Sequence, residues 1–177
     1  MATNNMQIFI LIAILFVCNF SEAKKAKIAH VEFYMHDIVG GPNPSAVRVA
    51  GQSSNTTGLN PITSMYGSVF VMDNALTSTP SLNSTLMGRA QGIYVMASQH
   101  NEFSLLMTLT YHFIQGSYNG SSFSVVGRNP VMNETREMPI VGGTGVFRMA
   151  RGYCLAKTYS MDQMDAVVGY NVTIFHY

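Results

Sequence analysis

An aspartate that follows an apolar strand-like segment has the clearest capacity for chemistry. Asp37 follows Val31, Phe33 and Met35 at intervals of two, so in an extended strand its carboxyl group shares a face with apolar side chains. Loss of hydration on such a face raises the pKa of a carboxyl group and lets it act as a general acid near neutral pH. An equally good interpretation is that Asp37 ends the strand and bonds backbone amides of the turn at 40–42.

A second aspartate and four arginines offer further polar chemistry. Asp73 ends a similar apolar run, but Asn74 and the polar residues after it favour a role in a turn. An arginine at the mouth of a barrel can hold a phenolate or stabilise developing negative charge, although most arginines only cover a surface. The four that lie near glycine-rich turns are Arg89, Arg136, Arg148 and Arg151.

Other common chemistries lack their motifs. The glycine-rich run at 142–145 is not followed by the lysine and helix of a phosphate-binding loop, so we interpret it as a turn between strands. The histidines are scattered and no second thiol lies near Cys154, so we expect no metal site and no cofactor. Cys154 itself has a strand-like setting, which favours a small buried hydrophobe over a nucleophile.

Charge and composition bound the class of protein. Lys and Arg total 10 against 9 Asp and Glu, so there is no electrostatic basis for binding nucleic acid or an anionic membrane surface. A hydrophobic content of 47% with only 11% charged residues argues against disorder, and 177 residues fit one domain. The 13 methionines supply pliable apolar side chains that fill a core or line an adaptable pocket.

The elements that must position these side chains are strands. Apolar and polar residues alternate over 103–113, which is typical of a half-buried strand. Further segments rich in β-branched and aromatic residues are 28–39, 45–50, 67–73, 89–97, 121–126, 147–158 and 167–177. Because a closed sheet leaves no exposed edges, we predict an all-β fold, an eight-stranded antiparallel β-barrel, in preference to a sandwich. A barrel of this size holds side chains or one small ligand.

The N-terminal segment predicts secretion. An unbroken run of eleven apolar residues at 8–18 is too short to span a bilayer, and small residues at Ser21 and Ala23 suit signal peptidase. We therefore expect a signal peptide at 1–23 and the barrel domain at 24–177, rather than an uncleaved anchor. Cleavage removes Cys18 and leaves Cys154 alone, so no intramolecular disulfide is expected, and the core and oligomerisation must supply stability.

Secretion gives meaning to five Asn-x-Ser/Thr sequons. They are Asn55, Asn83, Asn119, Asn133 and Asn171. The first three lie in polar, turn-like stretches and are the best acceptors. Asn171 lies in an alternating run, where pairing in a sheet is the alternative.

Three motifs follow one another along the chain. They are Phe-Tyr-Met-His-Asp-Ile at 33–38, Gly-Arg-Ala-Gln-Gly-Ile-Tyr at 88–94, and Gly-Gly-Thr-Gly-Val-Phe-Arg-Met-Ala-Arg-Gly at 142–152. Together they resemble the plant dirigent protein family. The resemblance implies an eight-stranded antiparallel barrel, commonly a trimer, that is glycosylated and secreted to the apoplast. It also implies capture of phenoxy radicals, which a separate laccase or peroxidase makes from monolignols such as coniferyl alcohol, and their coupling to optically active lignans.

The resemblance also points to pocket residues. Asp37, Tyr94, Arg136 and Thr158 match the family's pocket positions. Asn129 departs from it, because lignan-forming members have an aspartate there and an amide cannot donate a proton as an acid does. This departure, the missing cysteine pair and Val146 make the chain more similar to another branch, which includes pterocarpan synthase-like proteins that dehydrate an isoflavanol through a quinone methide.

Three functional hypotheses follow. In the first, which we favour, the barrel is a homodimeric or homotrimeric scaffold in which Tyr94 and Arg136 orient phenoxy radicals and Asp37 bonds a hydroxyl. In the second, Asp37 protonates a benzylic hydroxyl and the protein is a dehydratase that needs no oxidant. In the third, the barrel is a ligand carrier that tolerates the loss of Asp37.

Overall fold

A single antiparallel sheet that curls into a barrel makes up nearly the whole fold. The computed structural model describes residues 25–51, 64–100 and 102–177; the expected signal peptide at 1–23 and the sequon at Asn55 lie outside them. The strands are β1 (Lys27–Asp37), β2 (Ala46–Ala50), β3 (Val69–Thr77), β4 (Leu86–Met96), β5 (Ser104–Phe113), β6 (Ser122–Pro130), β7 (Arg136–Thr144), β8 (Arg151–Asp162) and β9 (Asp165–His176). Two 3₁₀ turns, η1 (Gly116–Tyr118) and η2 (Gly145–Phe147), lie in the connections.

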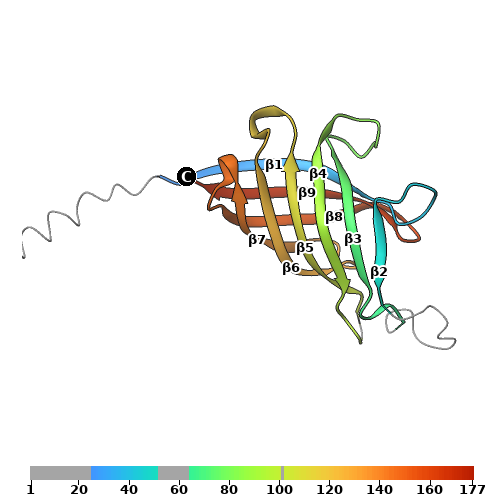
Figure 1. Cartoon of the computed structure of the whole chain (residues 1–177). Coiled ribbons are helices and arrows are strands. Elements are labelled where there is room, and N and C mark those ends of the chain that lie inside the picture. The colour runs from blue at the N-terminus through green and yellow to red at the C-terminus, as the bar shows by residue number, and fades with distance from the viewer. Residues whose placement is uncertain (1–24, 52–63, 101) are drawn as a thin grey trace, which may run out of the picture.

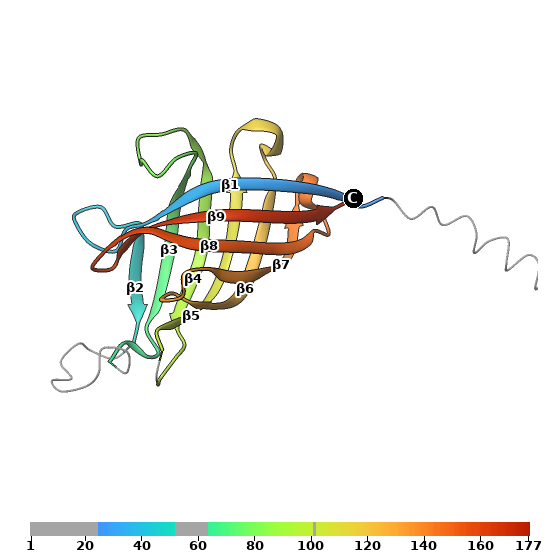
Figure 2. The same ribbon diagram turned by 180° about the vertical axis from the view of Figure 1, so that it is seen from behind.

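The barrel closes where the first strand meets the third. The sheet order is β1-β9-β8-β7-β6-β5-β4-β3-β2, and β1 also pairs with β3. This closure involves Tyr34–His36 of β1 and Ala75–Thr77 of β3, while β2 covers the remaining part of the same β3 edge. β1, β8 and β9 cross the view in Figure 1 and β3 to β6 run down it, and Figure 2 shows the same arrangement from behind. The eight-stranded antiparallel barrel predicted from the sequence is confirmed.

The strand that the sequence analysis missed is β7. The eight predicted segments included the residues of β2, which is the ninth strand of this sheet, and omitted Arg136–Thr144. Gly142, Gly143 and Thr144 pair with β6, so the glycine-rich run is the end of a strand that leads into η2, and its interpretation as a turn was wrong. β8 accordingly begins at Arg151, later than predicted.

The side chains that point into the barrel fill one end of it with aromatic rings and leave the other end open. Phe147 of η2 is fully buried and contacts the rings of Phe113, Tyr118 and Phe123, so it fills the end formed by the β5–β6 and β7–β8 connections. Deeper inside, Phe33 stacks on Tyr170 with ring centroids 5.2 Å apart. Burial of such rings contributes roughly 2 to 3 kcal/mol each. The cavity described below lies toward the opposite end.

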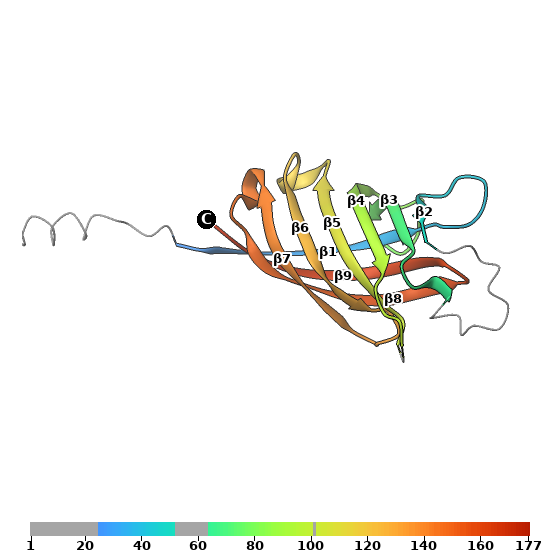
Figure 3. The ribbon, with the colours of Figure 1, turned by 60° about the horizontal axis from the view of Figure 1, so that its bottom comes forward.

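The opposite end carries the other connections. Because the strands are antiparallel, the β4–β5, β6–β7 and β8–β9 connections gather at one end, toward the lower right of Figure 3. The turn after β1 joins them, since Val39 N and Gly40 N donate to Asp165 Oδ1 at 2.8 and 2.9 Å. Cys154 is fully buried, as predicted, and burial raises the pKa of its thiol. No helix in the described residues is long and apolar enough to cross a membrane.

Candidate functional site

A cavity of about 660 Å³ occupies the open end of the barrel. This volume suits a ligand the size of a small drug molecule. Seven of the 13 methionines line it: Met35, Met65, Met96, Met107, Met132, Met161 and Met164. The thioether is polarisable and makes favourable contacts with aromatic rings, and the methionine side chain is flexible. The wall can therefore adapt to different aromatic ligands.

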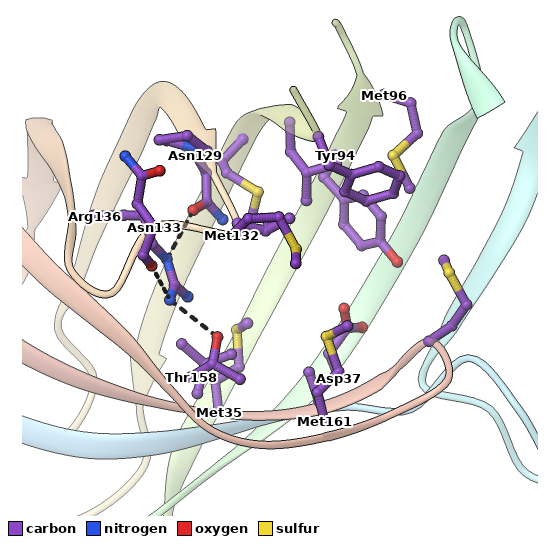
Figure 4. A pocket seen from close by; sticks show the side chains of 18 of the residues that line it. Met35, Asp37, Tyr94, Met96, Asn129, Met132, Asn133, Arg136, Thr158 and Met161 are labelled. Atoms are coloured by element: carbon purple, nitrogen blue, oxygen red, sulfur yellow. Dashed lines mark hydrogen bonds between the residues drawn. The ribbon is translucent and has the colours of Figure 1, made fainter. Parts of the chain in front are cut away.

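All five residues that the family resemblance placed in the pocket line this cavity. They come from five different strands: Asp37 from β1, Tyr94 from β4, Asn129 from β6, Arg136 from β7 and Thr158 from β8. Figure 4 shows two polar groups on the cavity wall, Asp37 with Tyr94 and Arg136 with Asn129 and Thr158. Met35 and Met132 lie between the two groups in this view, and the Tyr170 phenol, which also lines the cavity, interacts electrostatically with Arg136 and with Asp37.

The Asp37 carboxyl group faces the cavity rather than the turn after β1. The turn amides of Val39 and Gly40 are bonded by Asp165, so the strand-ending role considered for Asp37 belongs to another residue. Burial raises the pKa of Asp37 to about 6, although the hydrogen bonds with Asn74 and Tyr94 oppose the rise. At mildly acidic pH, Asp37 therefore exists in both protonation states and can donate a proton.

Tyr94 lies beside this acid within the cavity wall. Its ring is buried and stacks on Phe70 with centroids 4.8 Å apart, which fixes the direction of its hydroxyl group. Burial, together with the negative charge of Asp37, raises the pKa of the Tyr94 phenol well above its usual value. Tyr94 thus remains a neutral hydrogen-bond donor under ordinary conditions.

Arg136 is a buried cation whose partners are all neutral. Its Nε donates to Asn129 Oδ1 at 3.2 Å, and its Nη1 donates to Thr158 Oγ1 at 3.0 Å and to the backbone oxygen of Asn133 at 3.4 Å. Only 3% of the residue is exposed, and burial lowers the pKa of the guanidinium. The side chain is held firmly at the cavity, with its charge uncompensated by these contacts.

The other charged candidates lie outside the cavity. Asp73 sits within β3, which continues to Thr77, and its carboxylate forms an exposed ion pair of 2.7 Å with Arg89 on the outer face. The expectation that Asp73 belongs to a turn was therefore wrong. Arg148 is exposed in the β7–β8 connection, and Arg151 donates to the Val141 oxygen. Among the described residues, no group of three or more His, Cys, Asp or Glu side chains could hold a metal ion.

Asn74 is the site residue that sequence reasoning missed. It is fully buried on β3, donates to Asp37 Oδ1 at 3.0 Å and accepts from Ser45 Oγ at 2.6 Å. The signal was present, because Asn74 continues the inward alternation of Phe70 and Met72. Its polar type and its polar neighbours concealed that signal.

The sequons differ in their surroundings. Asn83, Asn119 and Asn133 are exposed in connections, with Asn133 at the cavity mouth. Asn171 lies within β9, and its amide donates to Glu32 Oε1 at 2.9 Å. It is therefore paired within the sheet, which was the alternative considered for this sequon. The exposed connections make Asn83, Asn119 and Asn133 accessible for glycosylation.

Comparisons with known proteins agree over nearly the whole barrel. The family model described as Dirigent-like protein matches residues 28–175. Dirigent protein 23 of Arabidopsis thaliana is 48% identical over 157 residues, which cover 88% of this chain and 81% of that protein. Pterocarpan synthase 1 of Glycyrrhiza echinata is 46% identical over 157 residues, with 87% and 81% covered. The solved structure of the pterocarpan synthase dirigent protein GePTS1 superposes with a TM-score of 0.78 at 45% identity and covers 88% of both chains.

Proposed function

The chain belongs to the dirigent protein family, and from that premise we propose that it binds phenoxy radicals of monolignols inside the barrel and imposes one handedness on their coupling to lignans. The observation that carries the proposal is the cavity of about 660 Å³, whose apolar wall holds two separate polar groups. Two fixed polar groups on an apolar wall can orient an elongated phenol in one direction.

The proposed chemistry selects geometry rather than lowering a high barrier. Each phenol loses one electron and one proton to an oxidant, and two radicals then combine to form one carbon–carbon bond. We assign the oxidation to a separate laccase or peroxidase. Radical combination is fast in solution, so the protein acts by holding one face of the radical toward its partner.

The polar groups have distinct roles in this proposal. The Tyr94 hydroxyl and the Arg136 guanidinium fix oxygen atoms of the ligand, because both are buried donors held by neighbouring side chains. Asp37 exchanges a hydrogen bond with a ligand hydroxyl. The methionines pack against the rings without imposing one shape.

A second candidate function is dehydration of an isoflavanol through a quinone methide. Asp37 favours it, because a carboxyl group with a pKa of about 6 is a competent acid at mildly acidic pH. Asp37 would protonate the benzylic hydroxyl, which leaves as water with the electron pair of its bond to carbon, while the ring phenol loses its proton. An internal hydroxyl would then add to the quinone methide and close the ring. The similar proteins include pterocarpan synthases.

We also propose the cellular setting that the sequence predicted. The N-terminal 23 residues would direct secretion to the apoplast, and exposed sequons such as Asn83, Asn119 and Asn133 would carry glycans. Association into a homodimer or homotrimer would add stability to a barrel whose one described cysteine is free.

The test of the proposal is chiral chromatography of products formed from coniferyl alcohol by a limiting laccase, with and without the protein. Enantiomeric excess that requires both proteins supports stereodirected coupling. A racemic product, together with oxidant-free conversion of an isoflavanol, supports the dehydratase instead. If the protein binds both ligands and changes the outcome of neither reaction, it is a carrier.

A further inference from the structure

The positive charge of Arg136 lacks an anionic partner within the described part of the chain. Its three accepting groups, the Asn129 amide, the Thr158 hydroxyl and the Asn133 carbonyl, are all uncharged. The ion pairs of the described residues are Arg89 with Asp73, Arg128 with Glu102 and Lys157 with Glu134. Arg136 belongs to none of them, although it is 3% exposed.

A buried cation without a counterion is costly. Removing an ion from water remains unfavourable even after relaxation, and neutral acceptors recover only part of that free energy. A guanidinium carries five N–H donors. The three hydrogen bonds seen for Arg136 use Nε and Nη1, so Nη2 keeps its two donors for a ligand.

The carboxylates that line the cavity do not neutralise this end. Asp37 lies in the other polar group, where it bonds Asn74 and interacts with Tyr94. Glu102 is at the cavity rim, but its carboxylate is paired with Arg128. The Arg136 end of the cavity is therefore positive, and the Asp37 end offers a proton acceptor or donor.

From this charge arrangement we infer that the cavity prefers planar phenols that carry a carboxylate, with the carboxylate at Arg136 and the phenolic hydroxyl at Asp37 and Tyr94. A carboxylate is ionised at pH 6, whereas a simple phenol with a pKa near 10 is neutral. The planar guanidinium also matches the two oxygens of a carboxylate. This inference rests on the proposed function only in using the same cavity for phenols.

Asn129 supplies the sharpest test of the charge argument. Its Oδ1 accepts from Arg136 Nε, so Asn129→Asp places a carboxylate of the same shape at hydrogen-bonding distance from the guanidinium. The internal counterion would remove the preference for an anionic ligand while leaving the volume of the cavity unchanged. Arg136→Gln removes the same preference by deleting the charge.

The experiment is isothermal titration calorimetry at pH 6 with two ligands that differ at one end, 4-hydroxycinnamate and 4-hydroxycinnamyl alcohol. The wild-type protein should bind the acid at least tenfold more tightly than the alcohol. In Asn129→Asp and Arg136→Gln this ratio should fall below about two, because the acid loses much more affinity than the alcohol does. Arg151→Gln, which removes an exposed arginine, should keep the wild-type ratio.

The outcomes separate this inference from the proposed function. If the wild type binds the alcohol as tightly as the acid, or if Asn129→Asp keeps the tenfold ratio, the inference is wrong while phenol binding stands. If the wild type binds neither ligand, the assignment of the cavity to phenols fails and the inference fails with it. Thermal unfolding of each variant identifies any that do not fold, and either cavity variant alone is sufficient for the test.

Discussion

Asn74 and Asp37 are joined by a hydrogen bond of 3.0 Å from the side-chain amide to the carboxylate, across the line where the barrel closes. The other side of the Asn74 amide accepts from Ser45 Oγ at 2.6 Å, and Ser45 in turn accepts from Ile38 N at 3.1 Å. One buried amide therefore connects the candidate acid to the bend between β1 and β2. Since Asn74 donates to the carboxylate, it also limits the rise in the pKa of Asp37 that burial causes.

Replacing Asn74 by Leu should weaken the fold and raise the pKa of Asp37 further. The substitution keeps the branch at Cγ but removes the donor to Asp37 and the acceptor for Ser45, so the free energy of unfolding should fall by at least about 1 to 3 kcal/mol. Urea denaturation measures the loss, and carbon-detected NMR titration measures the pKa.

The matched control for Asn74 is Asn171→Ala, which removes an exposed amide that bonds Glu32. Its effect on unfolding should stay within about 0.5 kcal/mol. Equal losses of unfolding free energy in the two variants would contradict the claim that the buried hydrogen bonds of Asn74 stabilise the fold. An unchanged Asp37 pKa in Asn74→Leu would contradict the expected further rise.

The pH dependence of stability should carry the signature of Asp37. Its pKa rises from 3.8 to about 6 on folding, so the folded chain binds more protons than the unfolded chain between these values. Stability from this group is present at low pH and is lost as pH rises from about 4 to about 6, by roughly 2 to 3 kcal/mol. Asp37→Asn should therefore be nearly neutral at pH 4 and stabilising by about 2 kcal/mol at pH 7.5.

Comparison of the variant with wild type isolates this effect. Burial lowers the pKa of His36, which acts in the opposite direction, but it does so in both proteins and cancels. Chemical denaturation at the two pH values gives the four free energies required. A difference between variant and wild type that is the same at pH 4 and pH 7.5 would contradict the raised pKa.

The same substitution separates the two candidate functions. If Asp37 is a general acid, Asp37→Asn should lower the rate of oxidant-free isoflavanol dehydration at least 100-fold, because an amide has no proton to give. Coupling of phenoxy radicals requires no acid, so its enantiomeric excess should fall by less than half. Chiral chromatography of both reactions, beside calorimetric binding of the product, distinguishes loss of chemistry from loss of binding. Undiminished dehydration would exclude the acid role.

Gly92, two residues before Tyr94 on β4, should be required for the stability of the fold. Its φ is +148°, and an added Cβ would lie 2.2 Å from the Thr108 oxygen on the paired strand β5. Gly92→Ala should therefore lower the free energy of unfolding by at least about 2 kcal/mol. At Gly142 an added Cβ meets nothing within 4 Å, so Gly142→Ala should change it by less than about 1 kcal/mol. Thermal and urea unfolding compare the two, and similar effects would show that the close approach at Gly92 is relieved by a small shift.

Strand alternation made much of the barrel predictable, and local composition explains the errors. Residues 103–113 and the apolar face that ends at Asp37 follow the two-residue period, and the structure places them as predicted. β7 was missed because Pro139 and two glycines interrupt its pattern, although its backbone still pairs with β6 and β8. The alternation of residues within one strand does not show which neighbouring strands will pair with its backbone.

The candidate site was predictable only in part for a related reason. The five pocket residues were placed by resemblance to a family, since no local pattern brings β1, β4, β6, β7 and β8 together. Asn74 and Asp73 were assigned to a turn because polar residues follow them, yet burial of Asn74 depends on its contacts with Asp37 and Ser45. Those partners are 37 and 29 residues away in the chain.

The most direct test of coupling inside the barrel is whether filling the cavity abolishes stereocontrol. Met107 lines the cavity, whereas its neighbour Leu106 is 42% exposed on the outer face of β5. The measurement is the enantiomeric excess of coniferyl alcohol coupling by a limiting laccase in the presence of Met107→Trp or Leu106→Trp, each verified as folded. We predict that Met107→Trp gives a racemic product and that Leu106→Trp retains the wild-type excess. Full stereocontrol by folded Met107→Trp would contradict the claim that coupling is directed inside the barrel.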